Sequence, residues 1–416
     1  MKKLVFLAAS AAVILASCAK IENEANVALT SDEPVALGAY TGKAVTKAGA
    51  TGELTNEVLR NGFGVFAYQT RGTAALATPN FMYNTKVYGN PWNYDIIKYW
   101  PNQIQAGNTD SQSPAAQAEQ IDKVSFFAYA PYVDHKVALG TTGITALTAN
   151  NASGDPKVTY TVGTTLDQQV DLCWGVVNPA EDLAWKTVAN TTINLAKGMP
   201  FLGLQKPAAA NKTIHFYFRH ALAQINLKAV AAYDQVAAGG TAKNDVKITI
   251  KEVVLTVPGM NTSAKLNLNN TAANTPKWED AAGSSDLVLT VDGDNIHADL
   301  KDAGEGKKAS EQPAGVTASE HDVIVANKYF TVLPAGAKTI NVKVTYYVTT
   351  DDADLATGFS RVENVISHDV DFSALAAGTK NTIKMILGIS EVKFEAEVTN
   401  WESGVDSNVD LPVNNY

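Results

Sequence analysis

The chain has 416 residues, of which 46% are hydrophobic and 18% are charged, and its formal net charge is −9 at pH 7. This composition is typical of a folded chain, and the length exceeds what one hydrophobic core organises, so we expect two domains. The negative charge and the scarcity of arginine disfavour nucleic acid as a partner, because no arginine cluster can form around phosphate groups.

The N-terminal segment has the pattern of an export signal. Met1-Lys2-Lys3 precedes an apolar run from Leu4 to Leu15, which is too short to span a bilayer permanently. Cys18 directly follows Leu-Ala-Ser, the mark of a bacterial lipoprotein signal whose thiol is acylated and becomes the mature N-terminus. The alternative is that Cys18 is an ordinary apolar residue of a signal cut elsewhere. We therefore expect a signal over residues 1–17 and lipidation, such as palmitate, at Cys18.

Cys173 is the second and last cysteine, so no intrachain disulfide can form once Cys18 is acylated. It lies in an apolar run beside Trp174, which favours a buried and inert thiol over the alternative of a nucleophile. A secreted chain without disulfides depends on its hydrophobic cores for stability.

Short β-branched and aromatic runs, bounded by Gly, Pro, Asn or Asp, dominate the rest of the chain. Their spacing predicts an all-β fold of two antiparallel β-sandwich domains, of transthyretin-like, Greek-key type, rather than βαβ units. Helix is expected only as one or two turns near residues 115–120 and 369–377. The expected strands lie at residues 35–40, 64–68, 124–129, 158–162, 247–255, 264–268, 287–291, 329–333 and 340–348.

The Ala/Pro/Asn-rich stretch at residues 205–211 is the best candidate for a joint between domains, and a long hairpin loop is its alternative. We therefore expect an N-terminal sandwich over residues 48–207 and a C-terminal sandwich over residues 208–400. Gly42 to Thr51 is small and polar, and is expected to be an exposed loop that proteases can reach.

The sequence offers no constellation for catalysis. It lacks the Gly-x-Ser-x-Gly, His-Glu-x-x-His and P-loop motifs, and its six histidines are scattered, with His220 interpreted as a core residue. The acidic clusters at residues 292–295 and 351–354 lack the ligand spacing of a calcium loop and are better explained as tight turns. We expect no enzyme activity, no metal and no cofactor.

Several local motifs follow one another along the chain, and Lys98-Tyr99-Trp100-Pro101 with the later run at residues 125–132 is the most specific pair. Together they resemble the fimbrillins, the pilin lipoproteins that build type V pili in Bacteroidales. The same aromatic residues also fit plain core packing, because a strand with aromatic side chains on both faces lies inside a sandwich. The motifs lie at Cys18 and at residues 61–68, 98–101, 125–132, 170–174, 218–225, 330–334 and 398–401.

The resemblance implies a structural role. A fimbrillin is held on the outer membrane by its lipid until a surface trypsin-like protease removes the N-terminal strand. A C-terminal strand of another subunit then fills the vacated place, by β-augmentation, and the head-to-tail contact builds a filament. The implied partners are further copies of the chain or accessory pilins, and the implied role is adhesion and biofilm formation by a cell-surface fimbrium. The ligand bound in adhesion stays open.

Carried onto this chain, the resemblance assigns the displaced strand to Val35, Leu37 and Ala39 within a propeptide over residues 18–47. Fimbrillins are usually cut at arginine, but no arginine lies between Cys18 and Leu59. The expected cut is therefore at Lys47-Ala48, with Arg60-Asn61 as the alternative. If neither is cut, the chain would be an anchor or an unpolymerised accessory pilin.

The tail over residues 401–416 carries apolar residues that alternate, as expected for a donor strand with one buried face. A frayed terminus or an edge strand of its own domain is the alternative. The expected donor residues are Val405, Val409, Leu411 and Val413.

A carbohydrate-binding surface lipoprotein is the second function considered, and a surface hydrolase is a third that lacks an acid, base and nucleophile set. Glycan binding would require an exposed aromatic platform. The tryptophans considered for it are Trp92, Trp174, Trp185, Trp278 and Trp401.

Overall fold

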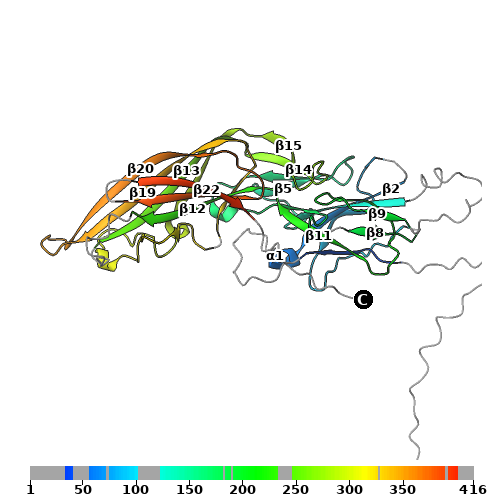
Figure 1. The fold of residues 1–416 in the computed structure, drawn as a ribbon, viewed down its shortest axis with the longest axis horizontal. Coiled ribbons are helices and arrows are strands. Elements are labelled where there is room, and N and C mark those ends of the chain that lie inside the picture. The colour runs from blue at the N-terminus through cyan, green and yellow to red at the C-terminus, as the bar shows by residue number, and fades with distance from the viewer. Residues whose placement is uncertain are drawn as a thin grey trace, which may run out of the picture.

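A computed structural model describes residues 33–40, 56–71, 75–101, 122–180, 183–188, 191–232, 246–326, 328–388 and 392–401. Within these ranges the chain forms an elongated molecule with β-sheet along its whole length (Figure 1). Helix is limited to α1 (Asn56–Asn61) and to short 3-10 turns, which confirms the all-β prediction. None of the described helices has the length and apolar character needed to cross a membrane.

The N-terminal lobe is built on a seven-stranded sheet in which β7 and β4 are central. Side chains of β4 alternate between two cores: Phe126 and Ala128 face one cluster, whereas Phe127 and Tyr129 face the other. The expectation of a strand with aromatic residues on both faces is confirmed. The order is β1 (Ala36–Ala39), β11 (Thr213–His220), β7 (Cys173–Val176), β4 (Asp122–Ala130), β2 (Phe63–Arg71) and β3 (Met82–Val87), with β10 (Phe201–Leu204) also on β4.

The C-terminal lobe has a four-stranded and a five-stranded sheet whose buried side chains join one hydrophobic cluster. Long strands alternate buried and more exposed residues in part of their length, from Val253 to Val257 in β13 and from Ile340 to Val344 in β19, as a sheet with one covered face requires. One sheet is β16 (Ser285–Asp292), β13 (Val246–Met260), β19 (Lys338–Asp351) and β20 (Phe359–Phe372). The other is β17 (His321–Asp322), β12 (Ala223–Ala231), β21 (Thr379–Leu387) and β22 (Val392–Asn400), with β18 (Phe330–Val332) on β12.

A further sheet joins segments from both sides of residue 207. Its order is β15 (Lys277–Ala282), β14 (Ser263–Asn267), β6 (Lys157–Thr161) and β5 (Gly143–Leu147), and β14 pairs with β6 along five residues, from Ser263 to Asn267. The sheets therefore do not divide at residue 207 as the sequence suggested. Residues 205–211 form a turn near the hairpin of β8 (Ala184–Lys186) and β9 (Thr192–Asn194). Hydrogen-bonded partners, and not chain order, decide which strands share a sheet.

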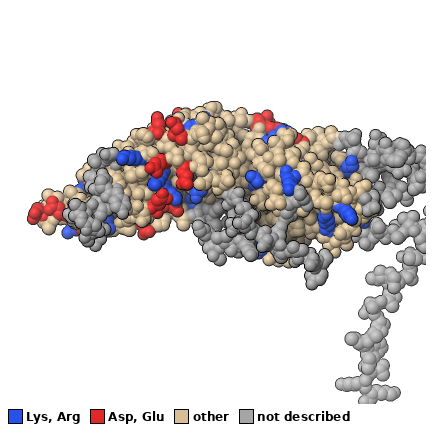
Figure 2. All heavy atoms as spheres, in the orientation of Figure 1, with Lys and Arg blue, Asp and Glu red and all other residues tan. Residues whose placement is uncertain are grey.

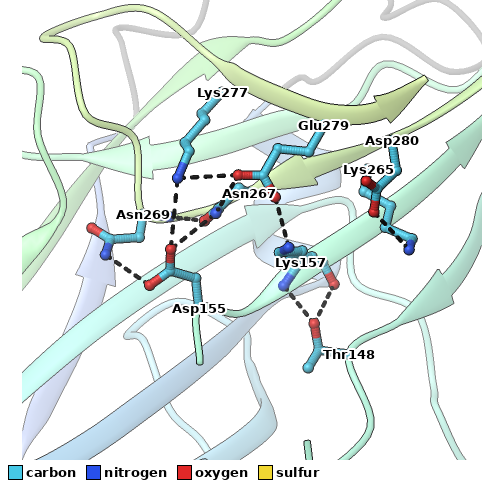
Figure 3. A network of polar contacts seen from close by, with 9 residues as sticks. All are labelled: Thr148, Asp155, Lys157, Lys265, Asn267, Asn269, Lys277, Glu279 and Asp280. Carbon is cyan, nitrogen blue, oxygen red and sulfur yellow. Dashed lines mark hydrogen bonds and ion pairs between the residues drawn. The ribbon is translucent and has the colours of Figure 1, made fainter. Parts of the chain in front are cut away.

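A polar network covers this joining sheet (Figure 3). The carboxylate of Glu279 lies 2.6 Å from Lys157 Nζ and 3.1 Å from Lys277 Nζ. Asn267 Nδ2 donates hydrogen bonds to Glu279 and to Asp155. The network therefore links β6 of the N-terminal half to β14 and β15.

The expected strands are present, and two details differ from expectation. The helical turns expected at residues 369–377 are wrong, because β20 continues to Phe372, which pairs with Lys338 of β19. Two pairs, β1 with β11 and β12 with β21, are parallel rather than antiparallel. The helical turns expected near residues 115–120 lie outside the described residues.

Charge is spread unevenly on the face that Figure 2 displays. Basic side chains are scattered over the N-terminal lobe, whereas acidic side chains gather mainly over the C-terminal lobe (Figure 2). The two ends of the long axis therefore present different charge on this face.

Candidate functional site

Strand β1 lies at the edge of the seven-stranded sheet and is hydrogen-bonded on both sides. On one side it runs parallel to β11, with Ala36 opposite Thr213 and Ala39 opposite Phe216. On the other side Val35 N donates to Lys98 O at 2.8 Å, and Trp100 N donates to Glu33 O at 3.0 Å. We call the place that residues 33–40 occupy between these two partners the β1 position.

The apolar side chains of β1 form part of the N-terminal core. Val35, Leu37 and Ala39 are at most 4% exposed, and they share one cluster with Phe63, Trp100 and Phe216. These are the three residues that the fimbrillin resemblance assigns to the displaced strand. The structure thus places them together on one buried face.

The opposite face of β1 is closed by Trp92. A Cβ atom on Gly38 would lie 2.7 Å from Trp92 Cδ1 and 3.1 Å from His215 Cδ2, so the close approach requires glycine. Trp92 in turn packs edge-on against Phe63, with ring centroids 5.6 Å apart. The motif residue Trp100 also belongs here, since it pairs with β1 and packs against Phe126.

Tyr94 fixes the start of β1. Its hydroxyl donates a hydrogen bond to Val35 O at 2.7 Å, and burial raises the pKa of that phenol, so the donor keeps its proton. The side chain of Glu33 accepts a hydrogen bond from Asn211 N at 2.8 Å, beside the start of β11. The strand is therefore held by backbone and side-chain contacts at its N-terminal end.

The other sequence-derived sites fall largely outside the described residues. These are Cys18, Lys47, Ala48, Val405, Val409, Leu411 and Val413. The alternative cut residues are described: Arg60 and Asn61 form the last turn of α1, where Arg60 O accepts a hydrogen bond from Gly89 N at 2.8 Å.

The described chain ends at Trp401, directly after β22. Trp401 N donates to Gly378 O at 2.7 Å, and the indole stacks on His220 with centroids 3.9 Å apart. His220 is the last residue of β11, the strand that carries β1. The tail thus starts at the junction between the two lobes.

Beside this stack lies a buried cluster that the sequence did not reveal. His220 Nδ1 lies 2.8 Å from Asp171 Oδ1, and Cys173 Sγ lies 3.5 Å from each of these atoms. All three side chains are buried. The available signal was weak: Asp171 and Cys173 stand two residues apart, but only the pairing of β7 with β11 brings His220 to them. Among the described residues, this carboxylate, thiol and imidazole form the group of side chains that could together hold a metal ion.

The remaining candidate residues have structural environments. Trp174, Trp185 and Trp401 are buried, and Trp92 and Trp278 are half-buried, so none of the five is an exposed platform for a sugar ring. The acidic clusters form turns, as predicted: Asp351 accepts hydrogen bonds from two backbone amides, and Asp352 accepts one from Asp354 N.

No protein-family model matches the sequence, and no curated protein sequence does. Among solved structures, a fimbrial protein from Bacteroides vulgatus superposes with a TM-score of 0.57 at 22% identity, over 89% of this chain and 100% of that chain. The chain has the fold of a Bacteroides fimbrial protein. The resemblance to fimbrillins is thereby confirmed at the level of the fold.

Two candidate cell adhesion proteins superpose less closely on this fimbrial fold. They come from Bacteroides uniformis and Bacteroides ovatus, with TM-scores of 0.41 and 0.42 and identities of 13% and 12%. The superpositions cover 89% and 90% of this chain and 98% and 99% of those chains.

Proposed function

We propose that this chain is a structural subunit of a cell-surface pilus, and that assembly replaces β1 by a strand from another copy. The observation that carries the proposal is the β1 position itself. A short edge strand runs parallel to β11 and buries three alternating side chains. In this role the chain acts by binding other copies rather than by catalysis.

Loss of β1 would leave an opening that favours refilling. Lys98 O, Trp100 N and Phe216 O would each lose a backbone hydrogen bond. Fully burying one valine or leucine side chain stabilises a protein by about 1.5–3 kcal/mol, so the uncovered core would lose several such contributions. An open edge beside an exposed core is a template for strand addition.

The tail has a sequence suited to that place. Val409, Leu411 and Val413 repeat the spacing of Val35, Leu37 and Ala39, with valine and leucine in the same order. A period of two presents the three side chains to one face whether the donor runs parallel or antiparallel to β11. In the parallel alignment Pro412 would take the place of Gly38 beside Trp92, where even a Cβ atom meets the indole. The antiparallel alignment places Asp410 there instead, so in either alignment the Trp92 side chain must shift to admit the donor.

Proteolysis within residues 41–55, before α1, would cut β1 from the rest of the chain. Lys47-Ala48 is the favoured site. A protease must draw its substrate into an extended form, and Arg60 lies in a helical turn whose carbonyl is hydrogen-bonded to Gly89 N. Either cut would leave residues 33–40 held in the sheet by non-covalent contacts alone. An uncut chain would retain its own strand and act as an anchor or accessory subunit.

The experiment treats the full chain with a lysine-specific protease and follows high-order ladders on detergent gels without boiling. Conversion should expose Ala48 as the new N-terminus and produce ladders. Lys47→Gln should abolish the new N-terminus at Ala48, and because Lys43 lies in the same stretch, Lys43→Gln with Lys47→Gln should abolish the ladders as well. The double variant Val409→Asp, Leu411→Asp should be cut normally yet stay monomeric, while Asp410→Asn should still assemble. Ladders that persist in the double variant would refute the donor-strand assignment.

We also propose that Cys18 tethers the precursor to the outer membrane by lipid. A clickable palmitate analogue should label the full chain in its natural envelope and fail to label Cys18→Ala. Because the tether precedes the expected cut, the label should leave with the N-terminal fragment. A label retained on assembled material would show that residues 18–47 stay attached.

A further inference from the structure

Asp171, Cys173 and His220 form a compact donor set in the interior of the molecule. Their three donor atoms lie within 4.8 Å of one another, and the side chains of His220 and Asp171 are 3% and 0% exposed. Cys173 is fully buried. The set joins the turn before β7, the first residue of β7 and the last residue of β11.

The separations between the donor atoms fit a tetrahedral metal centre. With Zn–S near 2.3 Å and Zn–N or Zn–O near 2.1 Å, tetrahedral geometry places the sulfur about 3.6 Å from each of the other donors. The observed distances from Cys173 Sγ to His220 Nδ1 and to Asp171 Oδ1 are both 3.5 Å. The distance from His220 Nδ1 to Asp171 Oδ1 is 2.8 Å, a hydrogen bond that would open to about 3.4 Å around a metal.

Charge and ligand type favour zinc. A carboxylate and a thiolate together carry two negative charges, so a divalent cation would leave the buried group neutral, as an apolar interior requires. Thiolate and imidazole donors select zinc over magnesium or calcium, which prefer oxygen ligands alone.

A cavity of about 140 Å³ borders His220 and is lined by Trp174, Arg219, Thr379 and Trp401, among others, but neither Asp171 nor Cys173 lines it. The three protein donors therefore carry the site, and a water that completes a tetrahedral set would have to reach it past His220.

We propose that Asp171, Cys173 and His220 bind one zinc ion at the junction of the two lobes. Binding removes the thiol proton of Cys173 to solvent and moves the ring proton of His220 from Nδ1 to Nε2, so one proton is released per metal. The ion would tie β7 to the end of β11, beneath the Trp401 stack from which the tail begins. This inference does not depend on whether the chain polymerises.

The test uses the full chain carrying Cys18→Ala, in which Cys173 is the only thiol. The protein is unfolded in chelator, refolded with excess ZnCl₂ and desalted, and its zinc content is measured. We expect one zinc per chain, and in parallel samples refolded with CoCl₂ we expect a thiolate-to-cobalt charge-transfer band. Cys173→Ser and Asp171→Asn should weaken zinc binding at least tenfold, whereas His215→Asn, an exposed histidine of the same strand, should bind normally.

Loss of folding in a variant would not decide the matter, so two readouts use the unsubstituted site. Bound zinc should slow the reaction of Cys173 with a thiol reagent in mild denaturant, and should raise the unfolding temperature reversibly. Failure of the refolded chain to retain zinc, or an absent charge-transfer band with cobalt, would overturn the proposal. Equal zinc retention by a folded Cys173→Ser variant would do the same.

Discussion

The indole of Trp401 lies flat against the imidazole of His220, with centroids 3.9 Å apart and ring planes 11° apart. Tyr329 meets the same indole edge-on at 5.3 Å, and Trp401 is only 6% exposed. The last described residue of the chain is therefore fixed to the strand that carries β1. Where the tail begins is set by this contact and by the hydrogen bond from Trp401 N to Gly378 O.

Trp401→Ala should lower the free energy of unfolding by about 3–5 kcal/mol, the usual cost of removing a buried large aromatic side chain. Trp401→Phe should lose much less, since it keeps a ring on His220 and the indole N–H has no hydrogen-bond partner among the described residues. Urea unfolding followed by circular dichroism measures both. Equal losses for the two variants would contradict a role for ring stacking.

Gly38→Val should loosen β1. The new side chain would collide with Trp92, and overpacking of this kind costs about 1–3 kcal/mol. Because the strain falls on an edge strand, we expect faster hydrogen exchange over residues 33–40 with little change in β13 or β19. Ala36→Val is the matched control, since Ala36 is only half-buried. Unchanged exchange in Gly38→Val would mean that Trp92 moves aside freely.

Tyr160→Phe should destabilise the contact between the two halves. The hydroxyl donates to Val170 O at 2.8 Å and lies 3.0 Å from Thr331 Oγ1 of β18. Burial raises the pKa of Tyr160, so it stays a neutral donor at all working pH values. Leaving a buried acceptor unsatisfied costs about 1–3 kcal/mol, measurable as a lower midpoint in urea. Tyr99→Phe, at a half-exposed tyrosine, should be neutral.

Glu279→Gln should remove a pH-dependent part of the stability. The hydrogen bond from Lys157, with further ones from Asn267 and Lys277, lowers the pKa of Glu279 from 4.5 to about 2. Because the pKa of Glu279 is lower in the folded state, its ionised carboxylate stabilises the fold at pH values above the ordinary pKa of 4.5. This contribution is lost as the pH falls from about 4.5 to 2. For a largely solvated pair we expect about 1 kcal/mol at neutral pH.

Urea unfolding of the wild type and of Glu279→Gln at several pH values measures this difference. The gap should be greatest near pH 7 and should close near pH 2. Glu305→Gln, at an exposed loop glutamate, is the matched control and should leave the stability at neutral pH unchanged. A constant gap for Glu279→Gln at all pH values would assign its effect to packing.

Strand positions were predictable wherever the sequence alternated or was dense in β-branched and aromatic residues, as in β4, β13 and β19. Which strands pair with each other was not predictable. Nothing in the sequence around Ser263 indicates that β14 pairs with β6, about one hundred residues earlier. The helical turns expected at residues 369–377 were wrong for the same reason, because the pairing of β20 with β19 overrode a weak local helical pattern.

The sequence by itself determined the all-β class, the export signal pattern and the alternation Val35-x-Leu37-x-Ala39, while the donor role of Val409-x-Leu411-x-Val413 stays a prediction. These are local properties, since a period of two fixes which side chains share a face. Tertiary structure alone decided that β1 lies between β11 and residues 98–100, and that His220 meets Asp171 and Cys173. Such contacts join residues far apart in the chain, and they arise from sheet pairing and core packing that no local pattern encodes.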